Sequence, residues 1–544
     1  MGTKGTFSRN KIRKENSYFS QLRSIVETAF YGNNTEEIKT VEEAYRLAEQ
    51  SFQTIVTDLP IKHPELLGLP GNAKVLVENG GETVGRTAAA RRIYGMDKAE
   101  DEKLLPIIRQ AVYAGKSKKR YKTSGYIGLD KDFMIKAHLS VPEGQENNLL
   151  SWLLNFQPET QAYNELYVGS AQIDQGDIYL YQDPEWSHPD YPLGLAYFDP
   201  DHNAAVILGL NYFGELKKGA LSLAWNIANH TGYVACHGGQ KRFDNNNSSY
   251  VASFFGLSGS GKSTLTHAKH ENKYEVKVLH DDAFIISQKD GSSIALEPSY
   301  FDKTNDYPTD HPEVEYFLTV QNVGVTKDLE GKKVLVMEDI RNGNGRTVKS
   351  RYSTPNRVDK FEEATNAIYW IMKDDSLPPL IKLADPVLAA AFGATLATKR
   401  TSAERIEAGL DMNQLVIEPY ANPFRLYPLS SDYDRFKNLF TQHKIDCYII
   451  NTGTFMENKI PKEVTLGIIE AVVDKTARFI PFGPFEHMSY MEIEGYSPEL
   501  EKESYVDLVK DRIKMRVDYM SKANEAKGMD MLPEEALTAM MNLL

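Results

Sequence analysis

The chain has 544 residues, of which 41% are hydrophobic and 25% are charged, and its formal net charge is −13. These values are ordinary for a soluble globular enzyme of two to four domains, and the acidic balance argues against a general nucleic-acid binder. No stretch approaches the roughly 20 apolar residues that a membrane-spanning helix needs, and the two cysteines are too few for a disulfide framework. We therefore expect a cytoplasmic protein with no membrane and no nucleic-acid partner.

The N-terminal region combines a polar start with an early helix and strand. Residues 1–6 match a loose myristoylation pattern, but we expect an unstructured polar terminus there. Thr40 and Glu43 form a capping box that predicts an amphipathic helix over residues 41–56. A strand is predicted over 73–78, and the turn that follows would display Arg86 at a strand end. A solvated loop arginine is the open alternative for Arg86.

Residues 132–230 are rich in predicted strands and indicate an α/β domain. A polar block, 211–219, directly follows a buried type of strand at 204–210. Binding sites of α/β proteins gather at such strand exits, so Lys217 and Lys218 are candidate site residues. The competing interpretation places both lysines on a surface loop. The other elements predicted in this region are strands at 133–141 and 178–181 and a helix at 157–167.

A phosphate-binding pattern, G-x-x-x-x-G-K-[ST], occupies residues 256–263, between a predicted strand at 250–255 and a predicted helix at 264–270. Its glycines let successive backbone N–H groups point inward as an anion nest. Lys262 would neutralise the β- and γ-phosphates, and the Ser263 hydroxyl would hold the magnesium of the nucleotide. The predicted nucleotide contacts are Ser258, Gly259, Ser260, Gly261, Lys262, Ser263 and Thr264.

Paired carboxylates follow the next strand of this region. The predicted strand 276–280 ends at Asp281 and Asp282, and Asp281 lies 19 residues after Lys262, where a Walker-B type metal ligand is expected. A turn with a helix cap is the alternative interpretation. The remaining predicted elements are a strand ending in His237 at 233–237, a Gly/Asn-rich loop at 338–346, a strand at 367–372, a mobile cover at 373–399, a strand at 449–453 and a helical tail at 498–544.

Taken in order, these segments resemble the ATP-dependent phosphoenolpyruvate carboxykinases from about residue 70 to 480. The block 211–219 is similar to the lysine motif of the family, and His237 follows it at the family spacing. The segment 255–265 resembles the phosphate loop of the family and implies ATP. Further similarities are the aspartate pair, Leu377-Pro378-Pro379, Glu418-Pro419 and Asn451-Thr452-Gly453.

The resemblance implies an α/β, two-domain phosphoenolpyruvate carboxykinase-like fold. The N-terminal mixed α/β substrate domain would span 1–230, and the P-loop-containing mononucleotide-binding domain with its lid segment would span 231–485. A helical C-terminal extension would cover 486–544. The implied reaction is the reversible conversion of oxaloacetate and ATP to phosphoenolpyruvate, ADP and CO₂ by a monomer or small homo-oligomer.

The resemblance also implies roles for single residues. Lys218, His237 and Asp282 would bind a catalytic Mn²⁺, with Asp281 orienting a metal-bound water, and two nitrogen donors favour Mn²⁺ over Mg²⁺. For the other residues, the resemblance implies that Arg86 contacts the substrate carboxylate and that Tyr212 lines the same site. Arg346 would bridge the substrate and the transferred phosphoryl group, and Lys303 would contact the nucleotide. Arginine suits the roles of Arg86 and Arg346, because it binds carboxylate or phosphate with two parallel hydrogen bonds.

The chain departs from the family pattern beside the predicted small-acid site. After Arg86 it continues Thr-Ala-Ala-Ala-Arg-Arg where the family has Ser-Pro-Lys-Asp, and the residues after His237 and Asp282 also differ. A glutamate of the family is replaced around 310–311, and its arginine before the adenine segment is absent ahead of 416–419. Two alternatives therefore stay open: an ATP-dependent kinase with a different small-molecule or protein acceptor, and a catalytically silent ATP-binding regulator.

Overall fold

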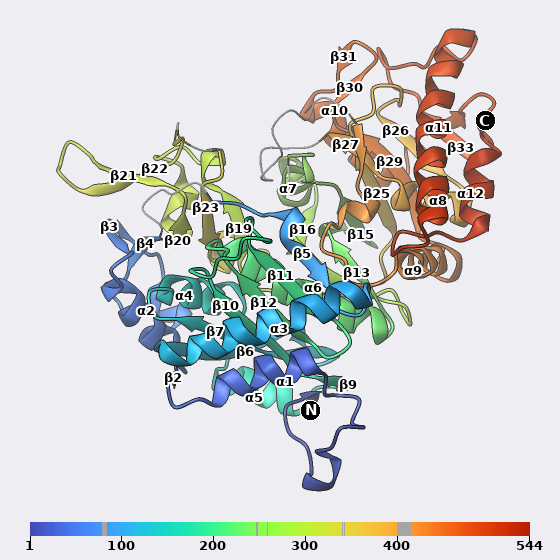
Figure 1. Ribbon diagram of the computed structural model, residues 1–544. Helices are drawn as coiled ribbons and strands as arrows, with labels where there is room; N and C mark the ends of the chain where they lie inside the picture. The colour runs from blue at the N-terminus through green and yellow to red at the C-terminus, as the bar shows by residue number, and fades with distance from the viewer. Residues whose placement is uncertain (79–83, 246–247, 258, 340, 342, 400–414) are drawn as a thin grey trace. The chain divides into compact units, whose positions relative to one another are not determined.

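The computed structural model describes residues 1–78, 84–245, 248–257, 259–339, 341, 343–399 and 415–544 (Figure 1). By internal packing the chain divides into two compact units. Unit 1 contains residues 1–227 and 296–355, and unit 2 contains most of the remainder. Residues 296–355 thus group with the N-terminal part, whereas the sequence-based division placed them in the nucleotide domain. The three sequence-based boundaries stay a prediction.

The larger sheet of unit 1 forms a mixed layer covered by helices. Helices α1 (Gln21–Thr28) and α3 (Lys98–Ala114) lie on one face, where their apolar side chains pack against β10, β11 and β12 (Figure 1). The strands in spatial order are β2 (Thr35–Glu37), β6 (Arg120–Asp130), β7 (Phe133–Pro142), β10 (Ile178–Asp183), β12 (Ala204–Leu208), β11 (Leu195–Asp199) and β5 (Arg91–Ile93), with β8 (Gln157–Pro158) beside β6.

A second sheet of unit 1 joins segments that are far apart in sequence. Strand β20 pairs in parallel with β4 and antiparallel with β23, so residues near 77, 320 and 347 lie side by side. The order is β19 (Tyr300–Lys303), β23 (Arg346–Lys349), β20 (Phe317–Gln321), β4 (Lys74–Glu78) and β3 (Ile55–Pro60), and β21 (Gly324–Lys327) and β22 (Lys333–Val336) form a separate hairpin. Helix α4 (Glu146–Asn155) contacts β20 and β23 of this sheet, and α6 (Phe213–His230) begins beside the end of β20.

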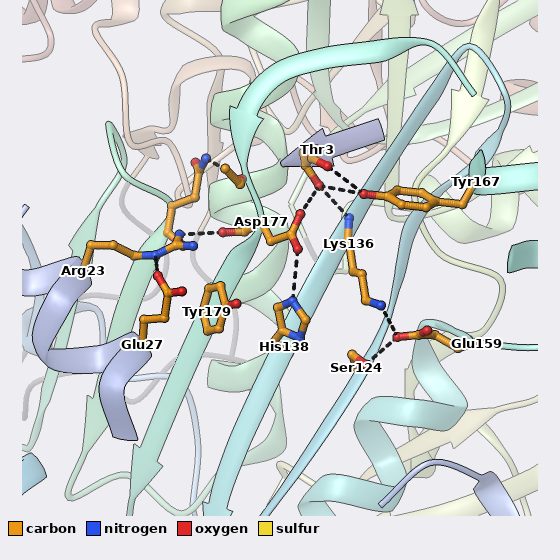
Figure 2. Close-up of polar contacts among 12 residues, drawn as sticks. Thr3, Arg23, Glu27, Ser124, Lys136, His138, Glu159, Tyr167, Asp177 and Tyr179 are labelled. Carbon is orange, nitrogen blue, oxygen red and sulfur yellow. Dashed lines mark hydrogen bonds and ion pairs between the residues drawn. The ribbon is translucent and has the colours of Figure 1, made fainter. Parts of the chain in front are cut away.

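The N-terminal residues are ordered in unit 1, so the expectation of an unstructured terminus was wrong. Strand β1 (Gly2–Lys4) pairs in parallel with β9 (Gln172–Gly176). The Thr3 hydroxyl donates to Asp177 at 2.6 Å and accepts from the Lys136 backbone N–H at 3.0 Å. Figure 2 shows that Asp177 also meets His138, and that Tyr167 donates to the Thr3 carbonyl. These buried polar contacts give the terminus partners that a sequence pattern does not reveal.

Two predicted boundaries in unit 1 also differ from the structure. The capping box at Thr40 and Glu43 is present, but α2 (Val41–Gln50) ends six residues before the predicted end at residue 56. Ser51 already has an extended backbone, and Ile55 begins β3. The apolar residues thus keep helical spacing beyond the end of α2, across a turn and into β3. The predicted helix at 157–167 begins later in the structure, as α5 (Gln161–Val168), which Thr160 caps.

Unit 2 is built around a mixed sheet whose centre is parallel. Strands β15, β25 and β29 run parallel, and helices α7 (Lys262–His267) and α10 (Lys462–Val473) contribute apolar side chains to the core on this sheet. The order is β16 (Glu275–His280), β14 (Gly239–Asn245), β15 (Ser248–Phe255), β25 (Ala367–Met372), β29 (Asp446–Asn451), β26 (Leu380–Leu383), β33 (Met488–Met491) and β32 (Phe479–Pro481). A smaller sheet contains β13 (Tyr233–His237), β17 (Ala283–Ser287), β18 (Ser293–Ala295) and β24 (Lys360–Phe361).

The segment predicted as a mobile cover, 373–399, belongs instead to the core of unit 2. Strand β26 pairs with β29 and β33, and α8 (Pro386–Ala394) is buried from Leu388 onward. The double proline at 378–379 lies directly before β26, which is an interior strand of the sheet. Proline is tolerated at this position because no ladder hydrogen bond is needed there. Strand β27 (Ala397–Lys399) then pairs with β28 (Leu415–Ile417).

The predicted helical tail is confirmed. Helices α11 (Glu503–Ala526) and α12 (Glu534–Met541) lie side by side, drawn in red in Figure 1, and α12 contacts α8. The buried positions of α11 recur at helical spacing, and α9 (Leu429–Gln442) packs against α8 as well. Among the described helices, none combines the length and apolar character needed to cross a membrane.

Candidate functional site

The phosphate-binding pattern of unit 2 connects β15 to α7, as its sequence predicts. Gly259 and Gly261 have φ values of 79° and 97°, in the left-handed region where a side chain would be strained. Lys262 begins α7 and is 9% exposed, whereas Ser263 and Thr264 are exposed in the first turn. The predicted contact Ser258 lies outside the described residues.

The loop is held by residues from the carboxyl ends of two neighbouring parallel strands. Thr452, which follows β29, donates its hydroxyl to the Ser260 carbonyl at 2.7 Å. Lys373, which follows β25, donates to the Gly259 carbonyl at 2.7 Å. These bonds use the carbonyls of the loop, so they orient its backbone without consuming the N–H groups that an anion would need. Lys373 was missed because its segment had been predicted as a cover.

His237 and Asp282 meet beside this loop in unit 2. His237 ends β13, and Asp282 lies in the turn between β16 and β17. The His237 Nε2 is 2.9 Å from Asp282 Oδ1, and the Lys262 ammonium is 3.8 Å from the same oxygen. The structure therefore brings together two of the three predicted metal ligands and the lysine of the phosphate loop.

The hydrogen bond on the other ring nitrogen of His237 fits a metal-binding role. Nδ1 contacts the carbonyl of Ala421, which only accepts, so Nδ1 carries the proton. When the imidazole is neutral, Nε2 has a lone pair that faces the carboxylate oxygen of Asp282. A cation bound by both of these acceptors would stabilise this arrangement. In the described ranges, no group of three or more His, Cys, Asp or Glu side chains could hold a metal. The remaining predicted ligand, the amine of Lys218, lies in unit 1.

Asp281 points to a different partner from Asp282. Its Oδ2 lies 3.3 Å from His267 Nε2, at the end of α7, and the residue is 6% exposed. Burial raises the pKa of this carboxyl, but the hydrogen bond with His267 and nearby positive charges lower it below the ordinary value overall. Asp281 is therefore ionised beside the phosphate-loop helix.

In unit 1, Tyr212, Arg346 and Lys303 form one group. Arg346 and Lys303 are opposite each other on β23 and β19, and the charge of Arg346 lies close enough to Tyr212 to affect its pKa. Burial lowers the pKa of Lys303, and the positive charge of Arg346 lowers it further. Burial raises the pKa of Tyr212, while Arg346 opposes that shift. A cluster with this excess of positive charge is suited to an anion.

The predicted substrate arginine, Arg86, lies in a turn that α6 anchors. The Thr87 N–H donates at 2.9 Å to the buried carboxylate of Glu215, and Arg91 lies 3.9 Å from the other oxygen of that carboxylate. Burial lowers the pKa of Arg91 to about 10, Glu215 opposes the shift, and the charge of Arg86 adds to it. The two arginines are thus close enough to repel, and Glu215 compensates for part of their charge.

The two adjacent lysines of α6 have different environments. Lys217 is fully buried, with its ammonium 3.1 Å from the buried Glu297 carboxylate, which also accepts from Asn155 at 2.6 Å. Lys218 is partly exposed and lies 5.6 Å from the centre of the Trp225 ring. The predicted surface-loop alternative is therefore wrong for Lys217, because the block 211–219 begins a helix. Sequence reasoning did not select Glu297, and no local pattern marks it.

Comparison with known proteins places these residues in a family context. The family model described as phosphoenolpyruvate carboxykinase matches residues 92–493, which is more than half of the chain and begins after Arg86. A protein from Aeropyrum pernix named phosphoenolpyruvate carboxykinase (ATP) is 30% identical over 333 residues, covering 56% of this chain and 65% of the relative. A protein of the same name from Staphylococcus aureus is 24% identical over 378 residues, covering 65% of each chain. The chain thus spans about 65% of the length of these relatives.

Proposed function

The chain belongs to the ATP-dependent phosphoenolpyruvate carboxykinase family, and on that premise we propose that it converts oxaloacetate and ATP reversibly to phosphoenolpyruvate, ADP and CO₂. The observation that carries this proposal is the meeting of His237, Asp282 and Lys262 in unit 2. A phosphate loop alone is compatible with many nucleotide-binding proteins. A histidine whose Nε2 faces the Walker-B type aspartate would add, when neutral, a nitrogen donor for a transition metal.

The residues of the chain divide the work between an anion end and a nucleotide end. Arg86 would bind a carboxylate of oxaloacetate with two parallel hydrogen bonds, and Tyr212 would line the same site beside Arg346. Loss of CO₂ leaves the electron pair of the broken C–C bond as an enolate. The enolate oxygen then attacks the γ-phosphorus in line, and ADP leaves. Arg346 and Lys262 would neutralise the charge on the transferred group, with Lys303 beside Arg346.

The predicted ligands fit divalent cations at two positions. His237, Asp282 and Lys218 would hold Mn²⁺, and the exposed hydroxyl of Ser263 would hold the Mg²⁺ of the nucleotide. The cations would supply positive charge at the enolate and phosphate oxygens. Lys218 binds a cation only when neutral, which the charge of the cation promotes by lowering the pKa of the amine.

A second candidate function follows from the turn after Arg86. Its next three side chains, after Thr87, are alanines, and Phe301 lies 6.1 Å from Tyr212 between ring centres. If Arg86 is the only residue that selects the substrate, a site bordered by these alanines and by Phe301 is less polar than one that binds oxaloacetate. It favours, as the alternative, phosphoryl transfer from ATP to a different small-molecule or protein acceptor. A catalytically silent ATP-binding regulator is the third possibility for the family scaffold.

One assay separates these functions. Purified protein with Mn²⁺, ATP and oxaloacetate should form phosphoenolpyruvate, and Arg346→Ala should reduce kcat by about 10³- to 10⁵-fold. Arg46→Ala, on the exposed face of α2, is the matched control and should retain full activity. ATP consumption only with another acceptor would replace the proposal by the second function. ATP-dependent thermal stabilisation without any turnover would replace it by the third.

We also propose a cytoplasmic enzyme that acts on small molecules without a membrane or nucleic-acid partner, as a monomer or small homo-oligomer. Both cysteines, Cys236 and Cys447, are buried free thiols, in keeping with a reducing compartment. Size-exclusion chromatography with light scattering would decide the oligomeric state. A mass above that of a tetramer would contradict this part of the proposal.

A further inference from the structure

Two adjacent amides, Gln321 and Asn322, lie at the end of β20, where three segments with predicted site residues meet. Both side chains are buried, with exposures of 3% and 0%. In the strand register, Gln321 is opposite Arg346 of β23 on one side and Glu78 of β4 on the other. All of these residues belong to unit 1. No motif identifies the two amides in the sequence.

The side chain of Gln321 holds the start of α6. Its Oε1 accepts from the Phe213 N–H at 2.9 Å, and its Nε2 donates to Asn148 at 2.9 Å and to the Glu78 carboxyl. Phe213 directly follows Tyr212 and is the first residue of the helix that carries Lys217 and Lys218. Because an N-terminal N–H of a helix has no partner within the helix, this bond is a specific anchor. Gln321 thereby links the position of Tyr212 to the sheet.

The side chain of Asn322 bridges the two arginine-bearing loops. Its Nδ2 donates to the carbonyl of Val84 at 2.8 Å and to the carbonyl of Asn344 at 3.0 Å. Val84 precedes Arg86 by two residues, and Asn344 precedes Arg346 by two residues. One amide group therefore contacts the backbone of both loops.

The loops also touch directly, and the backbone of Asn322 suits the bridge. A Cβ atom on Gly85 would lie only 2.8 Å from the side-chain amide nitrogen of Asn344, so the Asn344 side chain of one loop packs closely against the backbone of the other. Asn322 has a φ of 63°, which asparagine tolerates better than most residues. This conformation turns the chain out of β20 at the point where the side chain spans both carbonyls.

We propose that Gln321 and Asn322 are positioning residues that set Arg86, Arg346 and Tyr212 relative to one another. The inference rests on the proposed function, because it assigns the two amides a part in that reaction. Arg86 and Arg346 must reach opposite ends of one small anion, and a displacement of about 1 Å in such a site can lower the rate by about 10²-fold. Neither amide has to touch the substrate for this effect.

The decisive variant is Asn322→Gly, with Asn203→Gly as its matched control. Glycine accepts the positive φ, so the change removes the two side-chain hydrogen bonds without straining the backbone. Asn203 is also 0% exposed, has a φ of 54°, lies in unit 1 and donates to the Gly176 carbonyl at 2.9 Å. Asn203→Gly thus deletes the same side-chain atoms from a buried asparagine that also has a positive φ but does not connect the two arginine-bearing loops. Asn322→Asp is a second variant, since its carboxylate keeps the shape but cannot donate.

Two measurements test the proposal. In the phosphoenolpyruvate-forming assay, Asn322→Gly and Asn322→Asp should lower kcat by about 10²-fold with an unchanged KM for ATP, whereas Asn203→Gly should stay within about twofold of wild type. Hydrogen–deuterium exchange should be faster at residues 84–90 and 343–347 in the Asn322 variants only. Equal kinetic losses in Asn322→Gly and Asn203→Gly would overturn the proposal, because they would indicate a general structural role.

Failure of the proposed function gives a different result. If wild-type protein forms no phosphoenolpyruvate, the carboxykinase assignment falls, while the exchange measurement still decides whether Asn322 holds the two loops together. Unchanged exchange at both loops in Asn322→Gly would then overturn the positioning role as well. Faster exchange confined to these loops would support the bridge in the absence of carboxykinase activity.

Discussion

The buried ion pair between Lys217 and Glu297 predicts a large and pH-dependent loss of stability in Glu297→Gln. Both side chains are 0% exposed, and the charged atoms are 3.1 Å apart. At an effective dielectric constant of about 20, the attraction at this distance is about 5 kcal/mol. Glutamine removes it and leaves a buried ammonium. Lys217 can avoid burying this charge by losing its proton. The free energy of that deprotonation therefore sets an upper limit on the loss of stability in Glu297→Gln.

The limit follows from the ordinary lysine pKa of about 10.4, which applies to the unfolded chain. Keeping Lys217 neutral costs about 4 kcal/mol at about pH 7.5 and about 1 kcal/mol at about pH 9.5. Glu297→Gln should therefore lower the free energy of unfolding by about 3–4 kcal/mol at the lower pH and by much less at the higher pH. Lys217→Met combined with Glu297→Gln should recover part of the loss at about pH 7.5, because no unpaired charge remains buried.

Urea denaturation followed by far-ultraviolet circular dichroism, performed at both pH values, measures these differences. Asp190→Asn is the control, since its partner Lys103 is about as close, at 3.0 Å, but both side chains are more than half exposed. It should leave the unfolding midpoint unchanged. A loss below about 1 kcal/mol for Glu297→Gln at about pH 7.5, or an equal loss at both pH values, would refute the reasoning.

Two further predictions concern nucleotide binding and a buried acid. Saturation with ATP at about 100 times Kd should stabilise the wild-type protein by about 2.7 kcal/mol, and Lys262→Ala should abolish this rise in Tm; a retained rise would contradict its role. Burial raises the pKa of Glu78 to about 7, so the folded state keeps a proton that the unfolded chain releases near pH 4.5. Stability due to Glu78 therefore falls as pH rises from about 5 to 7, and Glu78→Gln should gain up to about 3 kcal/mol over wild type between about pH 5 and 8. Urea denaturation across this range measures the gain, and a pH-independent difference between the two proteins would exclude the raised pKa.

Several elements were predictable because their determinants lie close together in sequence. The strand at 233–237, the strand at 367–372 and the helical tail were predicted from apolar periodicity, and the capping box at Thr40 needs only residues three apart. The phosphate loop was predictable for the same reason, since its glycines, lysine and flanking strand are contiguous. Membership of the family also followed from motifs of this kind. The roles of the single site residues stay predictions.

Other features were decided only by the tertiary structure, because they depend on residues that the fold brings together from distant positions. Gln321 meets Glu78 across 243 positions of sequence, and neither residue is part of a recognisable pattern. The burial of Lys217 depends on a carboxylate from Glu297, and the segment 373–399 is core because β29 and β33 flank its strand. Local sequence thus determined the glycine-rich loop between β15 and α7 where phosphate binding is predicted. Strand pairing between distant segments decided which side chains surround the predicted small-acid site of unit 1, since one strand's sequence does not specify its neighbours.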